Sequence, residues 1–403
     1  MRQHSRKLAA LAVPTLGLSL VAAPAALASG TSGSVRAGAS GTSGSVRVVA
    51  SHLDNPRGLV ARGGHIWVAE SGHGGSFCLD PMTCVGLSGA IARVGVNGRV
   101  HRVVTGLVSI AGSDGTAAGG PSDVSLSRGH IYAIMGGNTS GVPPTVPPSA
   151  QSLADAAMAQ FGQLIKASFG GSFRPVAGVG DHDFAWSADH KSLVPDQFPD
   201  SNPNGLLATR HGVWVVDAGA NTLDLVQGHR TQVVNFFQVP DGSPTDAVPT
   251  CIDRGPDGAL YVGELLGGNP APGHARVWRI VPGHRKTVWA RGLTAVNGCG
   301  FGPDGNFYAT EFQTGGLDFG PNASLAGDVV RINWHTHNQT HLAVGQLTVP
   351  SGFAAGHHAI YVSNCSIAPA TGFGPCPDGG QLIRIGVGSG RGHDEETETA
   401  EEH

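Results

Sequence analysis

Residues 254–268, RGPDGALYVGELLGG, place a tight-turn signal directly before a β-rich run that ends in a carboxylate. The arrangement returns almost verbatim as FGPDGNFYATEFQTGG at residues 301–316. Asp and Gly tolerate the backbone angles of a hairpin turn, and a run such as ALYVGE is typical of a strand. The stretch therefore predicts a β-hairpin that the chain uses more than once.

Four other stretches align with these two hairpins. They are NPRGLVARGGHIWVAES (55–71), GPSDVSLSRGHIYAIMG (120–136), NPNGLLATRHGVWVVDA (202–218) and VPSGFAAGHHAIYVSNC (349–365). Five copies keep a proline, at Pro56, Pro121, Pro203, Pro249 and Pro350, and the fifth copy has Asn297 there. Most copies are followed by two further strand-like runs, so each unit is predicted to be a four-stranded propeller blade. Six copies predict an all-β fold, a six-bladed β-propeller.

The sixth copy reaches only its third strand, GGQLIRI, before an acidic segment begins. Its missing outer strand has a candidate at the other end of the chain, because GSVRVVASHL (44–53) resembles GRVHRVVTGL (98–107). We therefore expect the N-terminal strand to close the ring, which removes the exposed sheet edges. The alternative is an open stack in which this match is incidental.

The two ends of the chain have compositions of their own. Residues 1–28 carry basic residues, an apolar run and the small-residue pattern Ala26-Leu27-Ala28, which predicts a signal peptide. Residues 29–43 are Gly/Ser-rich and predict a flexible linker, the propeller is expected over 44–388, and residues 389–403 predict an acidic disordered tail. We expect a secreted, extracellular monomer without a membrane span. Between the basic leader and the acidic tail the chain is nearly neutral, so no nucleic-acid partner is expected.

The repeats resemble NHL-type six-bladed propellers of the TolB-like class. More narrowly, NPRGL, GPSDVS, FGQLIK, DSNPNGLLA and GPDGALYVGELLGG…ARVWRI resemble the exported ScyD/ScyE family. The first turn here is RGGH, where that family more often has GPDG. The resemblance implies the fold and the export, but no defined biochemical activity.

The long connections are expected on one face, the top, where the second and fourth strands of each blade end. They include residues 71–89, 136–160 and 363–380, and the stretch GVGDHDFAWSADHKSLVPDQFPDSNP. Only SAQSLADAAMAQFGQL permits a helix. Long loops on one side of a rigid scaffold are the usual site of binding, so we expect a small polar ligand or a protein partner on this face.

The position after the second strand is acidic in four of the six copies. Its occupants are Glu70, Met135, Asp217, Glu264, Glu311 and Asn364. One interpretation is a Ca²⁺ or other divalent cation, or a polar ligand, held by these carboxylates above the channel. The other is that each acid caps its own strand by accepting backbone N–H bonds. Asp123, Asp200 and Asn202 begin inner strands on the same face, where they either line the channel mouth or fix turns.

Catalytic and metal motifs give little support to an enzyme. The run HTHNQTH, with His335, His337 and His341, is expected on the bottom face without flanking carboxylates, so no metal site is assigned there. Nucleophile elbows, Walker loops and HExxH motifs do not occur in a suitable context. The leading hypothesis is an exported binding protein.

Two other hypotheses stay open at this point. Six-bladed relatives include metal-dependent lactonases and quinone-dependent dehydrogenases. In an enzyme of that kind Asn202 and the four acids would hold the metal, and a bound water would be the nucleophile. A structural module of the cell envelope is the third hypothesis.

The chain has six cysteines, an even number that predicts disulfides in an exported protein. Cys78 and Cys84 share one top loop, and Cys365 and Cys376 share another. Cys251 and Cys299 stand two residues after Pro249 and Asn297, on neighbouring inner strands that converge toward the channel. We predict that they either join blades 4 and 5 or remain buried thiols.

Overall fold

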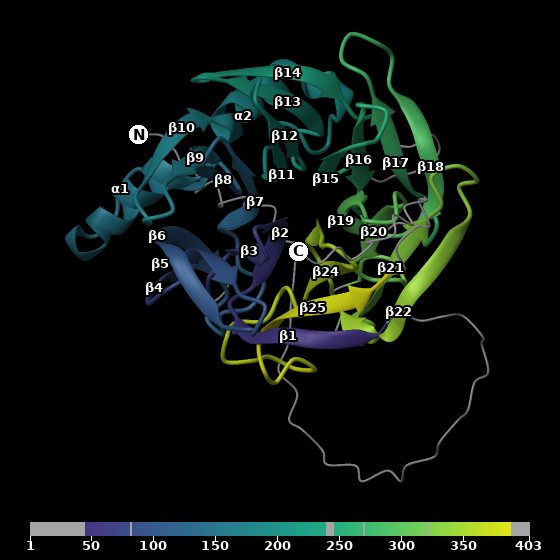
Figure 1. The fold of residues 1–403 in the computed structure, drawn as a ribbon. Helices are drawn as coiled ribbons and strands as arrows, with labels where there is room; N and C mark the ends of the chain where they lie inside the picture. Colours follow the sequence, from purple (N-terminus) through teal and green to yellow (C-terminus); the bar gives the residue numbers. More distant parts are fainter. Residues whose placement is uncertain are drawn as a thin grey trace, which may run out of the picture.

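The computed structural model describes residues 45–80, 83–238, 246–268, 271–318, 320 and 322–387. The expected signal peptide, linker and acidic tail lie outside these residues. Six antiparallel blades surround a central axis (Figure 1), so the chain is a six-bladed β-propeller. No helix among the described residues has the length and apolar character needed to cross a membrane.

Each blade has four strands, ordered from the axis outward. Blade 1 contains β2 (Pro56–Arg62), β3 (His65–Glu70), β5 (Thr83–Val94) and β6 (Val100–Ala111), with β4 (Phe77–Asp80) paired to β5; blade 2 contains β7 (Pro121–Ser127), β8 (His130–Met135), β9 (Gln163–Ala167) and β10 (Phe173–Gly178); blade 3 contains β11 (Pro203–Ala208), β12 (Val213–Asp217), β13 (Thr222–Gln227) and β14 (Arg230–Phe236). Blade 4 contains β15 (Pro249–Arg254), β16 (Leu260–Glu264), β17 (Ala275–Ile280) and β18 (Thr287–Leu293); blade 5 contains β19 (Val296–Phe301), β20 (Phe307–Glu311), β21 (Ala326–Ile332) and β22 (Gln339–Thr348); blade 6 contains β23 (Phe353–Ala355), β24 (Ala359–Asn364) and β25 (Gly380–Gly386).

The outer strand of blade 6 comes from the other end of the chain. β1 (Val46–Leu53) pairs antiparallel with β25, with Val46 opposite Ile385. Figure 1 shows the two segments side by side. The predicted closure of the ring by the N-terminal strand is therefore confirmed.

The repeated GPDG stretch has the same internal contacts in both copies. Asp257 accepts a hydrogen bond from the Tyr261 hydroxyl at 3.2 Å and forms an ion pair with Arg279 at 2.7 Å. Asp304 does the same with Tyr308 at 2.9 Å and Arg331 at 2.6 Å. The aspartate thus ties the hairpin turn to the second and third strands of its blade, which explains why the turn and the following tyrosine recur together.

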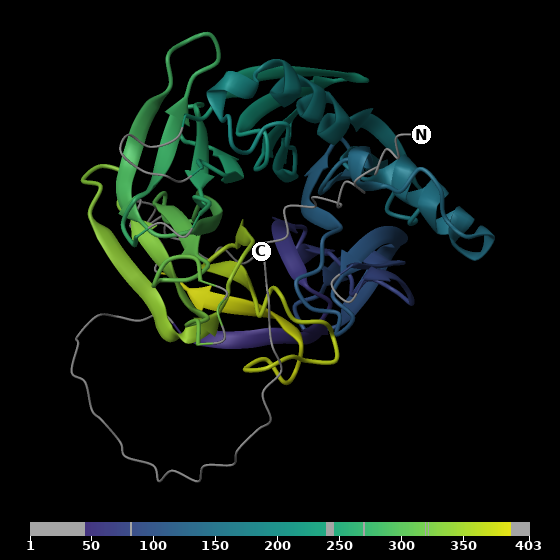
Figure 2. The same ribbon diagram turned by 180° about the vertical axis from the view of Figure 1, so that it is seen from behind.

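Two helices interrupt the β pattern. α1 (Gln151–Gln160) lies within the stretch expected to permit a helix and lies at the outer rim beside blade 2, as the view from behind also shows (Figure 2). α2 (Val179–Asp189) leads from blade 2 to blade 3. No helix was expected at α2, because its apolar residues do not follow a helical period.

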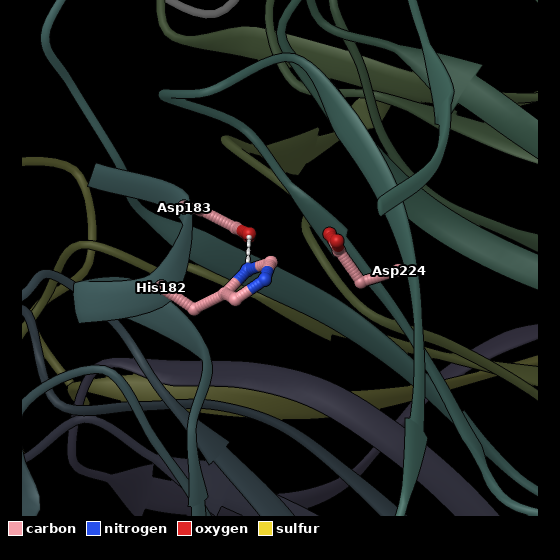
Figure 3. A group of neighbouring side chains, drawn as sticks. All are labelled: His182, Asp183 and Asp224. Carbon is pink, nitrogen blue, oxygen red and sulfur yellow. Dashed lines mark hydrogen bonds and ion pairs between the residues drawn. The ribbon is translucent and has the colours of Figure 1, made fainter. Parts of the chain in front are cut away.

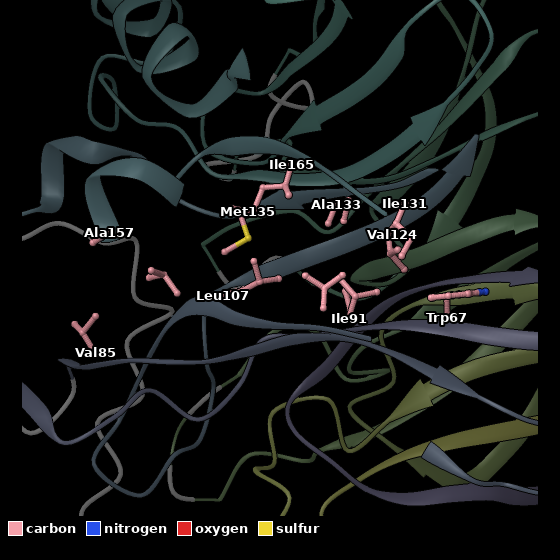
Figure 4. Packing of buried hydrophobic residues seen from close by; sticks show 14 residues of the cluster. Trp67, Val85, Ile91, Leu107, Val124, Ile131, Ala133, Met135, Ala157 and Ile165 are labelled. Atoms are coloured by element: carbon pink, nitrogen blue, oxygen red, sulfur yellow. The ribbon is translucent and has the colours of Figure 1, made fainter. Parts of the chain in front are cut away.

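The hydrophobic core lies between neighbouring blades rather than within one sheet. Between blades 1 and 2, Ile91 and Leu107 pack against Ile131, Met135 and Ile165 (Figure 4). A single blade leaves both faces exposed, so this core forms only where neighbouring blades stack on one another.

All three predicted disulfides are present, namely Cys78–Cys84, Cys251–Cys299 and Cys365–Cys376. The Cα atoms of Cys251 and Cys299 are 5.6 Å apart. One detail of the alignment was wrong: Val296, not Asn297, pairs with Glu311 as Pro249 pairs with Glu264. The two cysteines are therefore offset by one residue between β15 and β19. The reason is that the fifth copy lacks the proline that marks the strand start. Counting back by the same number of residues from Gly255 and Gly302 of the two GPDG turns leads to Pro249 and Val296.

Candidate functional site

The inner strands of all six blades surround a cavity of about 250 Å³ on the propeller axis. Polar side chains from five blades line it, among them Ser122, Asn204, Thr250, Asn297 and Ser351. The described residues around it include no Lys, Arg or His. Asn204 and Asn297 lie near the start of their strands, so the polar lining includes the top end of the channel.

Two carboxylates, Asp123 and Asp253, belong to this cavity. Asp123 accepts hydrogen bonds from its neighbour Val124 N at 2.7 Å and from Leu206 N of the next blade at 2.8 Å. Asp253 accepts one from Phe301 N of the next blade at 2.9 Å. Each side chain therefore ties two inner strands together as well as lining the cavity.

Burial controls the protonation of the Asp123 carboxyl group. Removal from water raises its pKa to about 7, although the hydrogen bonds from Leu206 and Val124 act in the opposite direction. Burial also raises the pKa of Asp253. Both forms of Asp123 are consequently populated near neutral pH, and the cavity offers it no cationic side chain.

The acids that end the second strands make contacts within their own blades. Glu70 accepts hydrogen bonds from Asp54 N at 2.9 Å and from Arg102 at 2.7 Å. Glu264 is held by Arg276 at 2.8 Å and by the indole of Trp278. Glu70 and Glu264 are both buried, as is Glu311, the acid at the same position in blade 5.

Glu311 accepts a hydrogen bond from Thr294 N at 2.7 Å. Burial, together with the neighbouring charge of Asp328, raises its pKa to about 7. The four acids of this position are distributed over four blades, and within the described part of the chain no hydrogen bond or ion pair joins one of these acids to another. The structure therefore does not bring them together as a single ligand set.

Three of the expected site residues do lie together at the top of blade 3, namely Asp200, Asn202 and Asp217. Asp217 Oδ1 accepts hydrogen bonds from Asn202 N at 2.7 Å and from Gly219 N and Ala220 N of the following turn. Burial raises the pKa of Asp217 to about 7, and the nearby charge of Asp200 acts in the same direction. The Asn202 side chain accepts a hydrogen bond from Gly137 N at 3.0 Å, linking blade 3 to a loop of blade 2.

Two groups of possible metal ligands were not anticipated. Among the described residues, His182, Asp183 and Asp224 form one group, and Glu311, Asp328 and His341 form the other, each with ligand atoms within 4.8 Å of one another. Figure 3 shows the first group, with side chains from α2 and β13 pointing toward one another. No spacing rule connects residues 182–183 with residue 224, so only the tertiary structure could reveal the group.

The second group contains His341, the last residue of the histidine-rich run HTHNQTH. His341 was expected on the bottom face without carboxylates, but its Nδ1 lies 2.7 Å from Asp328. The expectation was wrong because β22 carries His341 away from the turn that contains His335 and His337, alongside β21.

Comparisons with known proteins give a weak likeness. No family model and no curated protein matches the chain. Among solved structures, a luciferin-regenerating enzyme has a TM-score of 0.45 at 9% identity, covering 86% of this chain and 100% of that one. A catalytically inactive virginiamycin B lyase from Staphylococcus aureus has a TM-score of 0.42 at 11% identity, covering 84% and 98%. A PQQ-bound aldose sugar dehydrogenase from Streptomyces coelicolor has a TM-score of 0.35 at 14% identity, covering 86% and 100%. Likeness of this degree is no guide to activity.

Proposed function

We propose that the chain is an exported β-propeller that binds a small polar ligand at the top end of its central channel. The observation that carries the proposal is the axial cavity of about 250 Å³, to which all six inner strands contribute and in which polar side chains converge. Concave sites with a few placed polar groups are the usual form of a ligand pocket. The size is below the roughly 300–1,000 Å³ of pockets for drug-sized molecules, which favours a small molecule.

The lining defines the class of ligand. Asp123 and Asp253 supply negative charge or carboxyl groups, and hydroxyl and amide groups surround them. Without a basic side chain in the described lining, an anionic ligand has no counter-charge. A primary amine or a polyol fits this chemistry, the amine through charge and the polyol through hydrogen bonds.

The proposal is tested with a panel of small amines and polyols, by thermal shift and then calorimetry. Compounds that bind are retested on Asn204→Leu, which places an apolar side chain at the cavity wall. The matched control is Gln232→Leu on the exposed outer strand of the same blade. We expect affinity to fall at least about tenfold in the first variant, a loss of about 1.4 kcal/mol, and to be unchanged in the second. An affinity that is unchanged in both variants would place the ligand outside the channel.

Export is the second part of the proposal. It rests on the signal peptide predicted over residues 1–28, on the three disulfides and on the resemblance of the quoted phrases to the ScyD/ScyE family. Amino-terminal sequencing of protein recovered from the culture medium tests it, and we expect the mature chain to begin near Ser29. Retention of residues 1–28 on a cell-associated protein would contradict export.

A further inference from the structure

The buried carboxylates of blade 3 differ from those of blades 1 and 4 in their counter-charge. In blade 1, Glu70 is 2.7 Å from Arg102, and in blade 4, Glu264 is 2.8 Å from Arg276. At the corresponding place in blade 3, Asp217 has two further acids nearby, Asp183 and Asp224. Within the described part of the chain, neither Lys nor Arg forms an ion pair with any of these three aspartates.

All three aspartates are fully buried. Thr222 Oγ1 donates a hydrogen bond to Asp224 Oδ2 at 2.7 Å, whereas the buried Asp224 Oδ1 receives none in the described structure. An ionised carboxylate oxygen without a donor or a counter-ion is costly in a protein interior. Burial and the neighbouring acids raise the pKa of Asp183 and Asp224 well above the usual range, as expected for a site that lacks a positive charge.

One imidazole completes the group. His182 Nδ1 lies 2.7 Å from Asp183 Oδ1, and the His182 side chain is 36% exposed. In Figure 3 the ring lies beside both carboxylates. With its proton on Nε2, the ring offers Nδ1 as a ligand beside the carboxylate oxygens, and the ligand atoms of the three residues lie within 4.8 Å of one another. The exposed side of the ring provides a path from solvent.

We propose that His182, Asp183 and Asp224 bind one divalent cation of the Zn²⁺ or Mn²⁺ class. Imidazole nitrogen together with carboxylate oxygen suits these cations, whereas Ca²⁺ prefers a shell of six to eight oxygens. The charge of Asp217 strengthens the site without a direct bond. The bound cation links α2 to β13 and so fixes the connection between blades 2 and 3. This site is separate from the channel, and the proposal does not depend on a channel ligand.

The test is calorimetric titration of the full mature chain, freed of metal with a chelator, using ZnCl₂ and MnCl₂. We expect one equivalent of either cation to bind at blade 3 and to raise the melting temperature. Binding at this site should be lost in Asp224→Asn and weakened at least about tenfold in His182→Gln. The matched control is His341→Gln in the second group, which should leave this equivalent in place.

Two ligand variants are used because one of them could lose metal binding simply by failing to fold. Circular dichroism checks Asp224→Asn, and if that variant does not fold, His182→Gln decides the question because its side chain is partly exposed. Absence of metal binding by the wild-type chain would overturn the proposal, and the aspartates would then share protons instead. Binding that persists in His182→Gln but disappears in His341→Gln would overturn it too, by placing the cation in blade 5.

Discussion

At the scale of single residues, the carboxyl groups near the axis serve the scaffold. Asp123 joins β7 to β11 through Leu206 N, and it fits there because Gly58 on the neighbouring inner strand has no side chain. A Cβ at Gly58 would overlap the Asp123 carboxylate. The glycine in NPRGL is therefore required by the close approach of the aspartate.

The raised pKa of Asp123 predicts an unusual dependence of stability on pH. Its folded pKa is about 7, against a reference value of 3.8. Between these values the folded state binds more protons than the unfolded state, so this group lowers the free energy of unfolding as pH rises. The slope is at most about 1.4 kcal/mol per pH unit for one group. Asp217 and Glu311 contribute in the same direction.

We expect Asp123→Asn to flatten this decline between about pH 4 and about pH 7, whatever its effect on absolute stability. Urea unfolding at several pH values measures the slope for the variant and the wild type. Equal slopes would show that Asp123 is ionised in the folded protein throughout this range.

At the scale of elements, β1 belongs to blade 6 although the other strands of that blade lie at the opposite end of the sequence. Ala50 and Leu53 of β1 are buried against blade 1 residues such as Leu59 and Val68. The strand thus completes the sheet of blade 6 and covers part of the interface between blades 6 and 1. Its removal exposes both the β25 edge and this apolar surface.

We expect a chain that begins at residue 54 to lose at least about 3 kcal/mol of stability, because burial of Leu53 alone accounts for roughly that amount. A chain that begins at residue 44 keeps β1 and is the control. Thermal and denaturant unfolding compare the two. Equal melting temperatures would contradict closure by this strand.

At the scale of the whole molecule, the ring is held by contacts between blades. The Cys251–Cys299 disulfide joins blades 4 and 5 across a sequence separation of 48 residues. Its sulfur atoms fit because Gly263 has no side chain, since a Cβ there would lie 2.7 Å from Cys251 Sγ. Sequence-distant inner strands are thus linked at the point where they approach the axis.

We expect the double variant Cys251→Ser/Cys299→Ser to be less stable by on the order of 4 kcal/mol, the chain-entropy value for a loop of this length. Denaturant unfolding measures the loss. Cys78→Ser/Cys84→Ser is the comparison, because its loop spans a separation of only 6 residues and should cost less. Non-reducing peptide mapping shows directly whether Cys251 and Cys299 are bonded, and recovering them as free thiols would rule the link out.

Much of the architecture could be predicted because it depends on local patterns. The GPDG turns, the alternation of ALYVGE and the repeat period all act within one hairpin or one blade, so the blade count and the closing strand follow from the sequence. The even number of cysteines predicts disulfides, but the sequence left open whether Cys251 and Cys299 pair, and the structure contains that bond. The one-residue shift between Pro249 and Val296 and the helix α2 were not predicted. The fifth copy lacks the proline that marks the strand start, and the apolar residues of α2 do not follow a helical period.

The repeat, the ring and the places where carboxylates end strands follow from sequence patterns alone. What those carboxylates contact depends on how the blades and their connections pack. Glu70 meets Arg102 of its own blade, whereas Asp224 meets Asp183, which arrives from a connection between two blades. A carboxylate's charge balance depends on residues within a few ångströms, and chain folding brings these from positions that sequence spacing does not relate.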